Sequence, residues 1–87
     1  MIEIKYFTAA WCGPCRVLGP IMDQVEQDFQ KEVSIEKIDV DTDRNKLNEY
    51  GVTSVPTLIF LKDGELIDRT VGVQSKSALD KKIRGIL

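Results

Sequence analysis

The sequence contains no histidine, and it has only two cysteines and three prolines. Histidine is the usual side chain that titrates between about pH 5 and 8. We therefore expect any activity change in that range to report a cysteine, the α-amino group, or a displaced carboxylate or lysine. Zinc usually takes about four ligands, so two cysteines without histidine predict no metal site unless two chains share the ion.

Two further absences concern membranes and nucleic acids. The uninterrupted apolar runs are only a few residues long, far short of the roughly 20 that cross a bilayer. The first residues, 1–5, alternate and carry charge, unlike a secretory signal, so we expect an intracellular, cytoplasmic protein. Twelve basic and fourteen acidic residues give a net charge of −2 with both signs mixed, which disfavours nucleic-acid binding.

The periodicity of apolar residues predicts a mixed α/β chain. Eighty-seven residues suffice for one modest core, so we expect a single domain over 1–87. Strands are predicted at 2–7, 33–40, 57–61 and 66–71, and helices at about 13–30, at 43–50, and from Ser75 or Ser77 to the C-terminus. Pro20 should bend the first helix without ending it, because the apolar stripe continues in phase beyond it.

These elements follow the order β-α-β-α-β-β-α. The opening strand, helix and strand call for a parallel pair with a right-handed crossover. The turn at Asp63-Gly64 predicts a hairpin that adds an antiparallel pair. In such a mixed sheet, the loop at the carboxyl end of the first strand is a favoured place for a functional site.

Both cysteines lie in that loop, in the motif Trp11-Cys12-Gly13-Pro14-Cys15. Cysteines at i and i+3 can bond or exchange electrons if the second lies in the first turn of a helix. A helix N-terminus stabilises the thiolate, which is the nucleophile of disulfide exchange, through free N–H groups and the dipole. We therefore predict that Cys12 attacks and that Cys15, one turn further in and more buried, resolves the mixed disulfide.

Three other uses of the cysteines remain open. A structural disulfide would close a very short loop with little entropic gain and would tend to be reduced inside a cell. A shared metal would need ligands from a second chain. Inert core cysteines are the third alternative, although Gly13 and Pro14 between them argue against burial in a helix interior.

Three separated motifs resemble the thioredoxin family over nearly the whole chain. They are the cysteine motif, Ser54-Val55-Pro56-Thr57 before an apolar strand, and Val71-Gly72-Val73 before the last helix. The resemblance implies a thioredoxin-like α/β fold with a four-stranded mixed sheet and helices on both faces. It also implies a thiol-disulfide oxidoreductase that reduces protein disulfides by dithiol/disulfide exchange, with Cys12–Cys15 as its redox disulfide.

The resemblance further implies a substrate-binding surface beside the cysteines. Val55-Pro56 would be a cis peptide whose Val55 backbone pairs with the substrate chain, whereas sequence alone equally allows a trans proline that starts a strand. Gly72 would keep the surface beside the thiolate flat, and Trp11 would cover the same apolar patch. A core aromatic is the alternative for Trp11. Gly13-Pro14 would belong to the same surface.

The resemblance also implies how electrons reach the protein. They reside in the cysteine pair, so no bound cofactor is expected. They would come from NADPH through a flavin-containing thioredoxin reductase and pass from a monomer to disulfide-containing proteins. A glutaredoxin-like protein served by glutathione is one alternative, although glutaredoxins more often carry Pro-Tyr where this chain has Gly13-Pro14. A thioredoxin-fold binding or scaffold module is the other.

The first departure from the family pattern lies at the N-terminus. Most thioredoxins begin with an additional strand and helix, and this sequence starts at what would be their second strand. Without that first strand, residues 33–40 would form a sheet edge, where Glu36 and Lys37 discourage pairing with another chain.

The second departure is Tyr6, six residues before Cys12, where the family usually has a buried aspartate that helps proton transfer at the resolving thiol. A phenol, whose pKa is ordinarily near 10, is a poor base at neutral pH. Lys37 matches the lysine that normally pairs with that aspartate. We predict that Lys37 approaches the Tyr6 hydroxyl or Asp39 and that Cys15 loses its proton through water or Lys37. A solvated Lys37 on an edge strand is the alternative.

Overall fold

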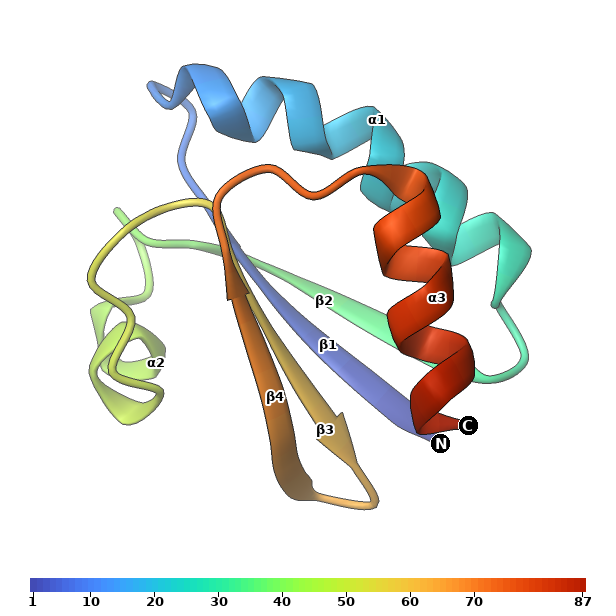
Figure 1. The fold of residues 1–87 in the computed structure, drawn as a ribbon. Coiled ribbons are helices and arrows are strands. Elements are labelled where there is room, and N and C mark those ends of the chain that lie inside the picture. Colours follow the sequence, from blue (N-terminus) through green and yellow to red (C-terminus); the bar gives the residue numbers. More distant parts are fainter.

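The computed structural model describes all 87 residues and contains one four-stranded sheet and three helices. The elements, in chain order, are β1 (Ile2–Thr8), α1 (Gly13–Asp28), β2 (Val33–Asp39), α2 (Arg44–Glu49), β3 (Thr57–Lys62), β4 (Glu65–Val71) and α3 (Lys76–Ile86). The strands lie in the order β2-β1-β3-β4 (Figure 1). β1 and β2 are parallel, and β3 is antiparallel to both β1 and β4. The predicted element order and mixed sheet are confirmed.

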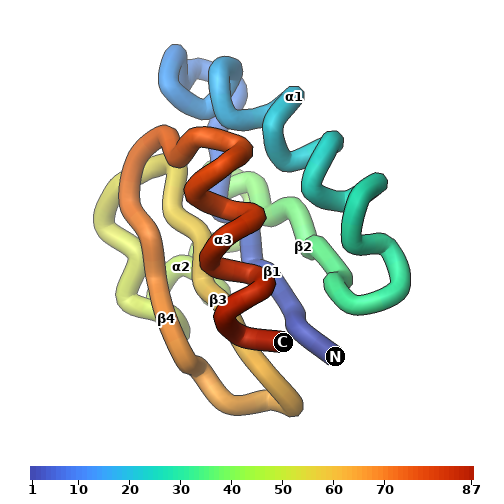
Figure 2. Tube along the Cα trace, turned by 45° about the vertical axis from the view of Figure 1, so that its right-hand side comes forward, coloured from blue at the N-terminus to red at the C-terminus, as the bar shows by residue number.

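One face of the sheet is covered by α1 and α3 (Figures 1 and 2). The alternation of β1 turns Ile2, Ile4 and Tyr6 toward this face, where Leu79 and Ile83 of α3 meet them. The apolar stripe of α1 completes the cluster with Leu18, Met22 and Val25. Burying each large aliphatic side chain contributes about 1.5–3 kcal/mol, so this cluster is the main source of stability.

The helix α1 follows its predicted course but ends two residues early, at Asp28. Pro20 lies inside it, and the helix continues beyond the proline, as expected. Phe29 leaves the helical conformation because its carbonyl accepts the N–H groups of Glu32 and Val33 in the turn into β2. Its ring nevertheless stays in the core, which explains why the apolar stripe extends past the end of the helix.

The opposite face of the sheet carries a second core cluster beneath α2, formed by five buried residues: Phe7, Ile38, Val52, Ile59 and Leu61. Leu47 and Tyr50 pack against this cluster, with the Tyr50 ring edge-on to Phe7 at 6.0 Å between centroids. No residue within α2 is itself fully buried. Helices therefore lie on both faces, but α2 is held by few contacts.

Beside α2, the second face carries an ion-pair network. The Nζ of Lys5 lies 3.0 Å from a carboxylate oxygen of Glu3 and 2.6 Å from one of Glu36, and Lys46 of α2 also pairs with Glu36. The hydrogen bond to Glu36 raises the pKa of Lys5, and the hydrogen bonds from Lys46 and Lys5 lower the pKa of Glu36. Glu36 thus places a paired charge on β2, an edge strand.

Both termini lie at one end of the sheet, opposite the loop between β1 and α1 (Figures 1 and 2). The N-terminal amine is 3.2 Å from the Oδ1 of Asp63 in the β3–β4 turn. Asp63 and Gly64 both have positive φ angles, 52° and 85°, as a tight hairpin turn requires. Lys62 donates to the carbonyl of Ile86 at 2.8 Å, which ties the end of α3 to the same region. None of the three helices has the length and apolar character needed to span a membrane.

Candidate active site

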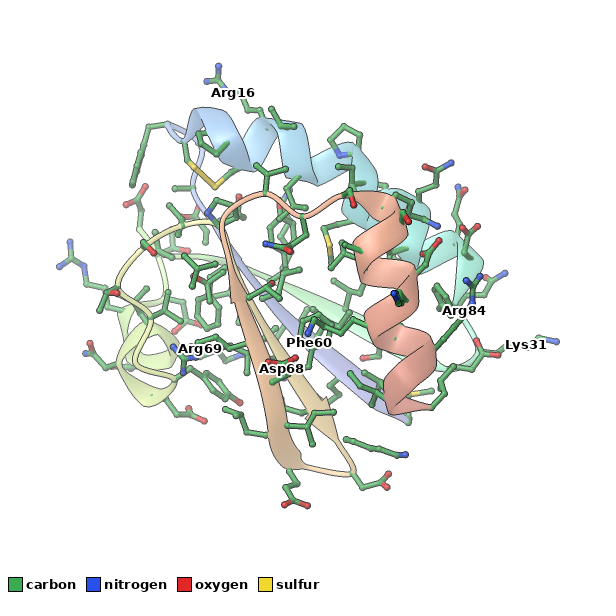
Figure 3. All side chains as sticks on the ribbon, in the orientation of Figure 1. Arg16, Lys31, Phe60, Asp68, Arg69 and Arg84 are labelled. Atoms are coloured by element: carbon green, nitrogen blue, oxygen red, sulfur yellow. A yellow bond between two sulfur atoms is a disulfide. The ribbon has the colours of Figure 1, made fainter.

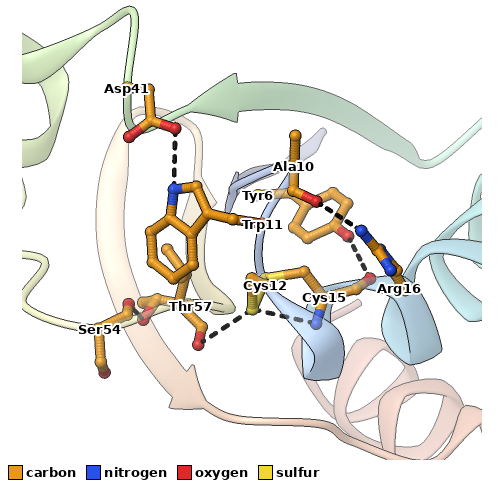
Figure 4. Close-up of a disulfide and its surroundings, with 10 residues drawn as sticks. Tyr6, Ala10, Trp11, Cys12, Cys15, Arg16, Asp41, Ser54 and Thr57 are labelled. Carbon is orange, nitrogen blue, oxygen red and sulfur yellow. Dashed lines mark hydrogen bonds between the residues drawn. A yellow bond between two sulfur atoms is a disulfide. The ribbon is translucent and has the colours of Figure 1, made fainter.

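The two cysteines form a disulfide at the start of α1, with their Cα atoms 5.3 Å apart. Cys12 is the N-cap residue, and its Sγ accepts a hydrogen bond from the backbone N–H of Cys15 at 3.2 Å (Figure 4). The positive end of the helix dipole favours negative charge at the same position. In the reduced protein, both effects would stabilise a thiolate on Cys12. Cys12 is 5% exposed and Cys15 is 3% exposed.

The segment before β3 lies against the disulfide. The Val55–Pro56 peptide is cis, and the carbonyl oxygen of Val55 is 3.7 Å from the Sγ of Cys12. The backbone N–H of Gly72 donates to the carbonyl of Pro56 at 2.9 Å. Gly72 has a φ of 87°, a conformation that favours glycine, while a Cβ there would meet no neighbouring atom. The constraint on Gly72 is therefore its backbone conformation, and the space beside it is open.

Trp11 lies on the surface with 66% of its area exposed, so it is not a core aromatic. Its Nε1 donates to the Oδ2 of Asp41 at 2.9 Å (Figure 4). A groove of about 290 Å³ runs beside the indole, and its apolar lining includes Val40, Val52 and Val55. An extended polypeptide could therefore contact the indole, the groove and the Val55 backbone at the same time.

A second cavity, of about 420 Å³, is lined by Cys15 and does not include Trp11 or Val55. Tyr6, Lys37 and Asp39 are among its lining residues. The Tyr6 side chain is buried, and its hydroxyl donates to the carbonyl of Cys15 at 3.3 Å (Figure 4). Lys37 is exposed and forms no hydrogen bond or ion pair with either Tyr6 or Asp39. Lys37 therefore shares the cavity with Tyr6 and Asp39 without bonding to either, because its exposed side chain extends into solvent from the edge strand β2.

Sequence reasoning missed two residues that brace the active-site loop. Asp41 holds the indole of Trp11, and the Nη2 of Arg16 donates to the carbonyl of Ala10 at 3.2 Å. A signal for Asp41 was available, because parallel β1 and β2 end at the same edge of the sheet and so bring the loops that follow them together. No group of three or more histidine, cysteine, aspartate or glutamate side chains is placed to hold a metal ion.

A disulfide at a helix N-terminus, beside an exposed indole and 3.7 Å from a backbone carbonyl, is the arrangement of a thiol-disulfide oxidoreductase. The sequence model of the thioredoxin family matches residues 3–85. The chain belongs to the thioredoxin family.

Relatives and a solved structure agree with this assignment. The chain is 42% identical to the thioredoxin of Bacillus subtilis (strain 168), over 94% of this chain and 79% of that protein. It is 40% identical to the thioredoxin of Chlorobaculum thiosulfatiphilum, over 88% of this chain and 71% of that protein. The structure of a mutant thioredoxin from Halobacterium salinarum NRC-1 superposes with a TM-score of 0.89 at 37% identity, covering 97% of this chain and 73% of that chain. The fold is therefore thioredoxin-like, and the protein is a thiol-disulfide oxidoreductase.

Proposed function

We propose that this protein reduces disulfides in other proteins, with Cys12 as the attacking thiol and Cys15 as the resolving thiol. The observation that carries the proposal is the position of Cys12 as N-cap of α1, where its Sγ accepts the Cys15 N–H beside the Val55 carbonyl. A sulfur in that position is stabilised as a thiolate and lies next to backbone with which an extended substrate can pair.

The exchange proceeds in two balanced steps. The Cys12 thiolate attacks one sulfur of the substrate disulfide, so that a Cys12–substrate bond forms, the substrate S–S bond breaks, and the departing thiolate takes a proton. The deprotonated Cys15 then attacks the Sγ of Cys12, which forms the Cys12–Cys15 disulfide and expels the second substrate thiolate. Two electrons pass to the substrate, and the protein is left with the disulfide that the structure contains.

The proton of Cys15 has to leave before the second step. We propose that it departs through water in the cavity shared by Tyr6, Lys37 and Asp39, with Lys37 as a candidate relay. The Tyr6 hydroxyl already donates to the carbonyl of Cys15, so it serves to hold the first turn of α1 and does not act as the base.

The remaining parts of the proposal concern partners. Substrate chains would dock on Trp11, Gly13-Pro14, the Val55-Pro56 backbone and the open surface beside Gly72. The oxidised protein would be reduced by a flavin-containing thioredoxin reductase that draws on NADPH. It would act as a monomeric electron carrier in the cytoplasm, with residues 1–87 as one domain and no bound cofactor.

Insulin reduction with dithiothreitol tests the central claim. Wild-type protein should accelerate precipitation of the insulin B chain, whereas Cys12→Ser should not, because it lacks the attacking sulfur. Cys15→Ser is the matched variant, and it should instead accumulate the mixed disulfide. Equal rates for wild type and Cys12→Ser would contradict the redox function and favour a scaffold role.

A coupled assay identifies the reducing pathway. With thioredoxin reductase supplied, NADPH should be consumed as this protein reduces insulin. With glutathione and its reductase supplied instead, this protein should not cause NADPH to be consumed. The opposite pattern would support the glutaredoxin-like alternative.

A further inference from the structure

Arg69 on β4 joins the sheet to the end of α2. Its Nη2 donates to the carbonyl of Tyr50 at 2.5 Å, and its Nη1 donates to the carbonyl of Gly51 at 3.3 Å. Figure 3 shows Arg69 between β4 and α2, away from α1 and α3. No part of the reaction described above uses this side chain.

The two carbonyls belong to a weakly held helix end. Tyr50 is the C-cap of α2, and Gly51 follows it with a φ of 62°. Carbonyls at a helix C-terminus lack intrahelical partners and carry the negative end of the dipole, so a guanidinium is a well-matched donor there. Because α2 has six residues and none of them is buried, its position depends on a few contacts, among which these hydrogen bonds are the ones from β4.

The helix end leads directly to the site. Residues 51–56 run from the Arg69 anchor to the peptide bond whose Val55 carbonyl lies 3.7 Å from the Cys12 sulfur. Arg69 faces Ile59 across the β3–β4 ladder, and Ile59 shares its core cluster with Val52, while Val55 packs against the same cluster. The guanidinium of Arg69 and the packing of Val52 therefore hold the start of the 51–56 segment in place beside the sheet.

The far end of the segment has its own anchor. The Gly72 N–H donates to the Pro56 carbonyl at 2.9 Å, and the Thr57 hydroxyl donates to the Ser54 carbonyl at 2.7 Å. Both Gly72 and Arg69 lie at or just after β4, so one strand fixes both ends of the segment.

We propose that Arg69 is a positioning residue for polypeptide substrates. It fixes the 51–56 segment so that the Val55 backbone is already in place when an extended chain docks. This inference rests on the proposed function, because it concerns how the same site receives a protein disulfide. A small disulfide without a polypeptide backbone cannot pair with the Val55 backbone. The rate at which it is reduced should therefore not depend on Arg69.

The test compares Arg69→Met with wild type on two substrates, insulin and 5,5′-dithiobis(2-nitrobenzoate). Removing both hydrogen bonds should raise KM for insulin about fivefold with kcat little changed, and the rate with the small disulfide should stay within about twofold. Arg69→Lys keeps the charge and one donor group, so it should restore part of the insulin KM. Arg84→Met is the control, since Arg84 is an exposed arginine on α3, remote from the segment (Figure 3).

An unchanged KM for insulin in Arg69→Met, with Cys12-dependent insulin reduction intact in wild type, would overturn the role of Arg69 alone. An equal loss with both substrates would also overturn it, because that result indicates general damage to the thiol site. If wild type reduced insulin no faster than Cys12→Ser, the proposed function and this inference would both fail.

Discussion

Replacing Tyr6 by aspartate should place a carboxylate base beside the resolving cysteine, whose proton is otherwise proposed to leave through water or Lys37. Tyr6 is 4% exposed and lines the same cavity as Cys15, so a carboxylate introduced there would lie in the path that the Cys15 proton takes. Lys37 and Arg16 also line that cavity, and their positive charge favours the ionised carboxylate over the neutral one. Tyr6→Asn is the matched control, because it removes the same ring and hydroxyl without adding a base.

The size of the gain follows from thiol ionisation. An ordinary thiol with a pKa of about 8.5 is only about 3% ionised at pH 7, so a nearby base can speed the second step by at most about thirtyfold. At pH 9 most of the thiol is already ionised, and the gain should fall below about twofold. The difference between Tyr6→Asp and Tyr6→Asn should therefore be largest near pH 7 and should vanish toward pH 9.

Rapid mixing with a peptide disulfide, followed by acid quench, alkylation and mass spectrometry, measures the decay of the Cys12 mixed disulfide. Both variants lose a buried ring and should be less stable than wild type by about 3–5 kcal/mol, so the comparison is between the two variants under conditions where both are folded. Identical decay rates for the two variants from pH 6 to 9 would refute the view that Cys15 lacks a local base.

Two further predictions concern stability, measured by urea denaturation. Ser75→Ala should lower the free energy of unfolding by about 1 kcal/mol, because the Ser75 hydroxyl caps α3 by accepting the Ala78 N–H at 3.1 Å, whereas Ser77→Ala should change it little. Equal effects of the two substitutions would contradict the assigned cap. Glu36→Gln should cost about 0.5–1 kcal/mol at pH 7, because Glu36 is 41% exposed in its pair with Lys5. Folding lowers the pKa of Glu36 below its ordinary 4.5, so the pair stabilises above that value, and the cost should disappear as the pH falls through the folded pKa. A cost that persists at pH 2 would argue against an electrostatic origin.

Much of the fold could be predicted because local periodicity and core burial agree. The alternation of β1 and the helical stripe of α1 each identify a face that the structure buries, and both residues of the Asp63-Gly64 turn have the positive φ angles that a tight hairpin needs. The position of the cysteine motif at a helix N-terminus could also be predicted, since its spacing, its glycine and its proline all suit that position.

Long-range side-chain partners were not predictable in the same way. Lys37 lies on the strand face that Tyr6 occupies, as the sequence indicates, but β2 is an edge strand, so the flexible lysine side chain can extend into solvent instead of bonding to the phenol. The hydrogen bonds of Arg69 depend on where α2 ends relative to β4, and α2 has no buried residue from which its position could be inferred. Such contacts follow from the assembled tertiary structure and leave no periodic signal.

The placement of the two termini has a practical consequence for engineering. Both chain ends lie at the end of the sheet remote from Cys12, and the N-terminal amine already pairs with the β3–β4 turn. A fluorescent protein or affinity tag fused at either end should therefore leave the substrate surface free. A short flexible linker could also join the ends, which makes the chain a suitable subject for circular permutation, with new ends opened in an exposed turn.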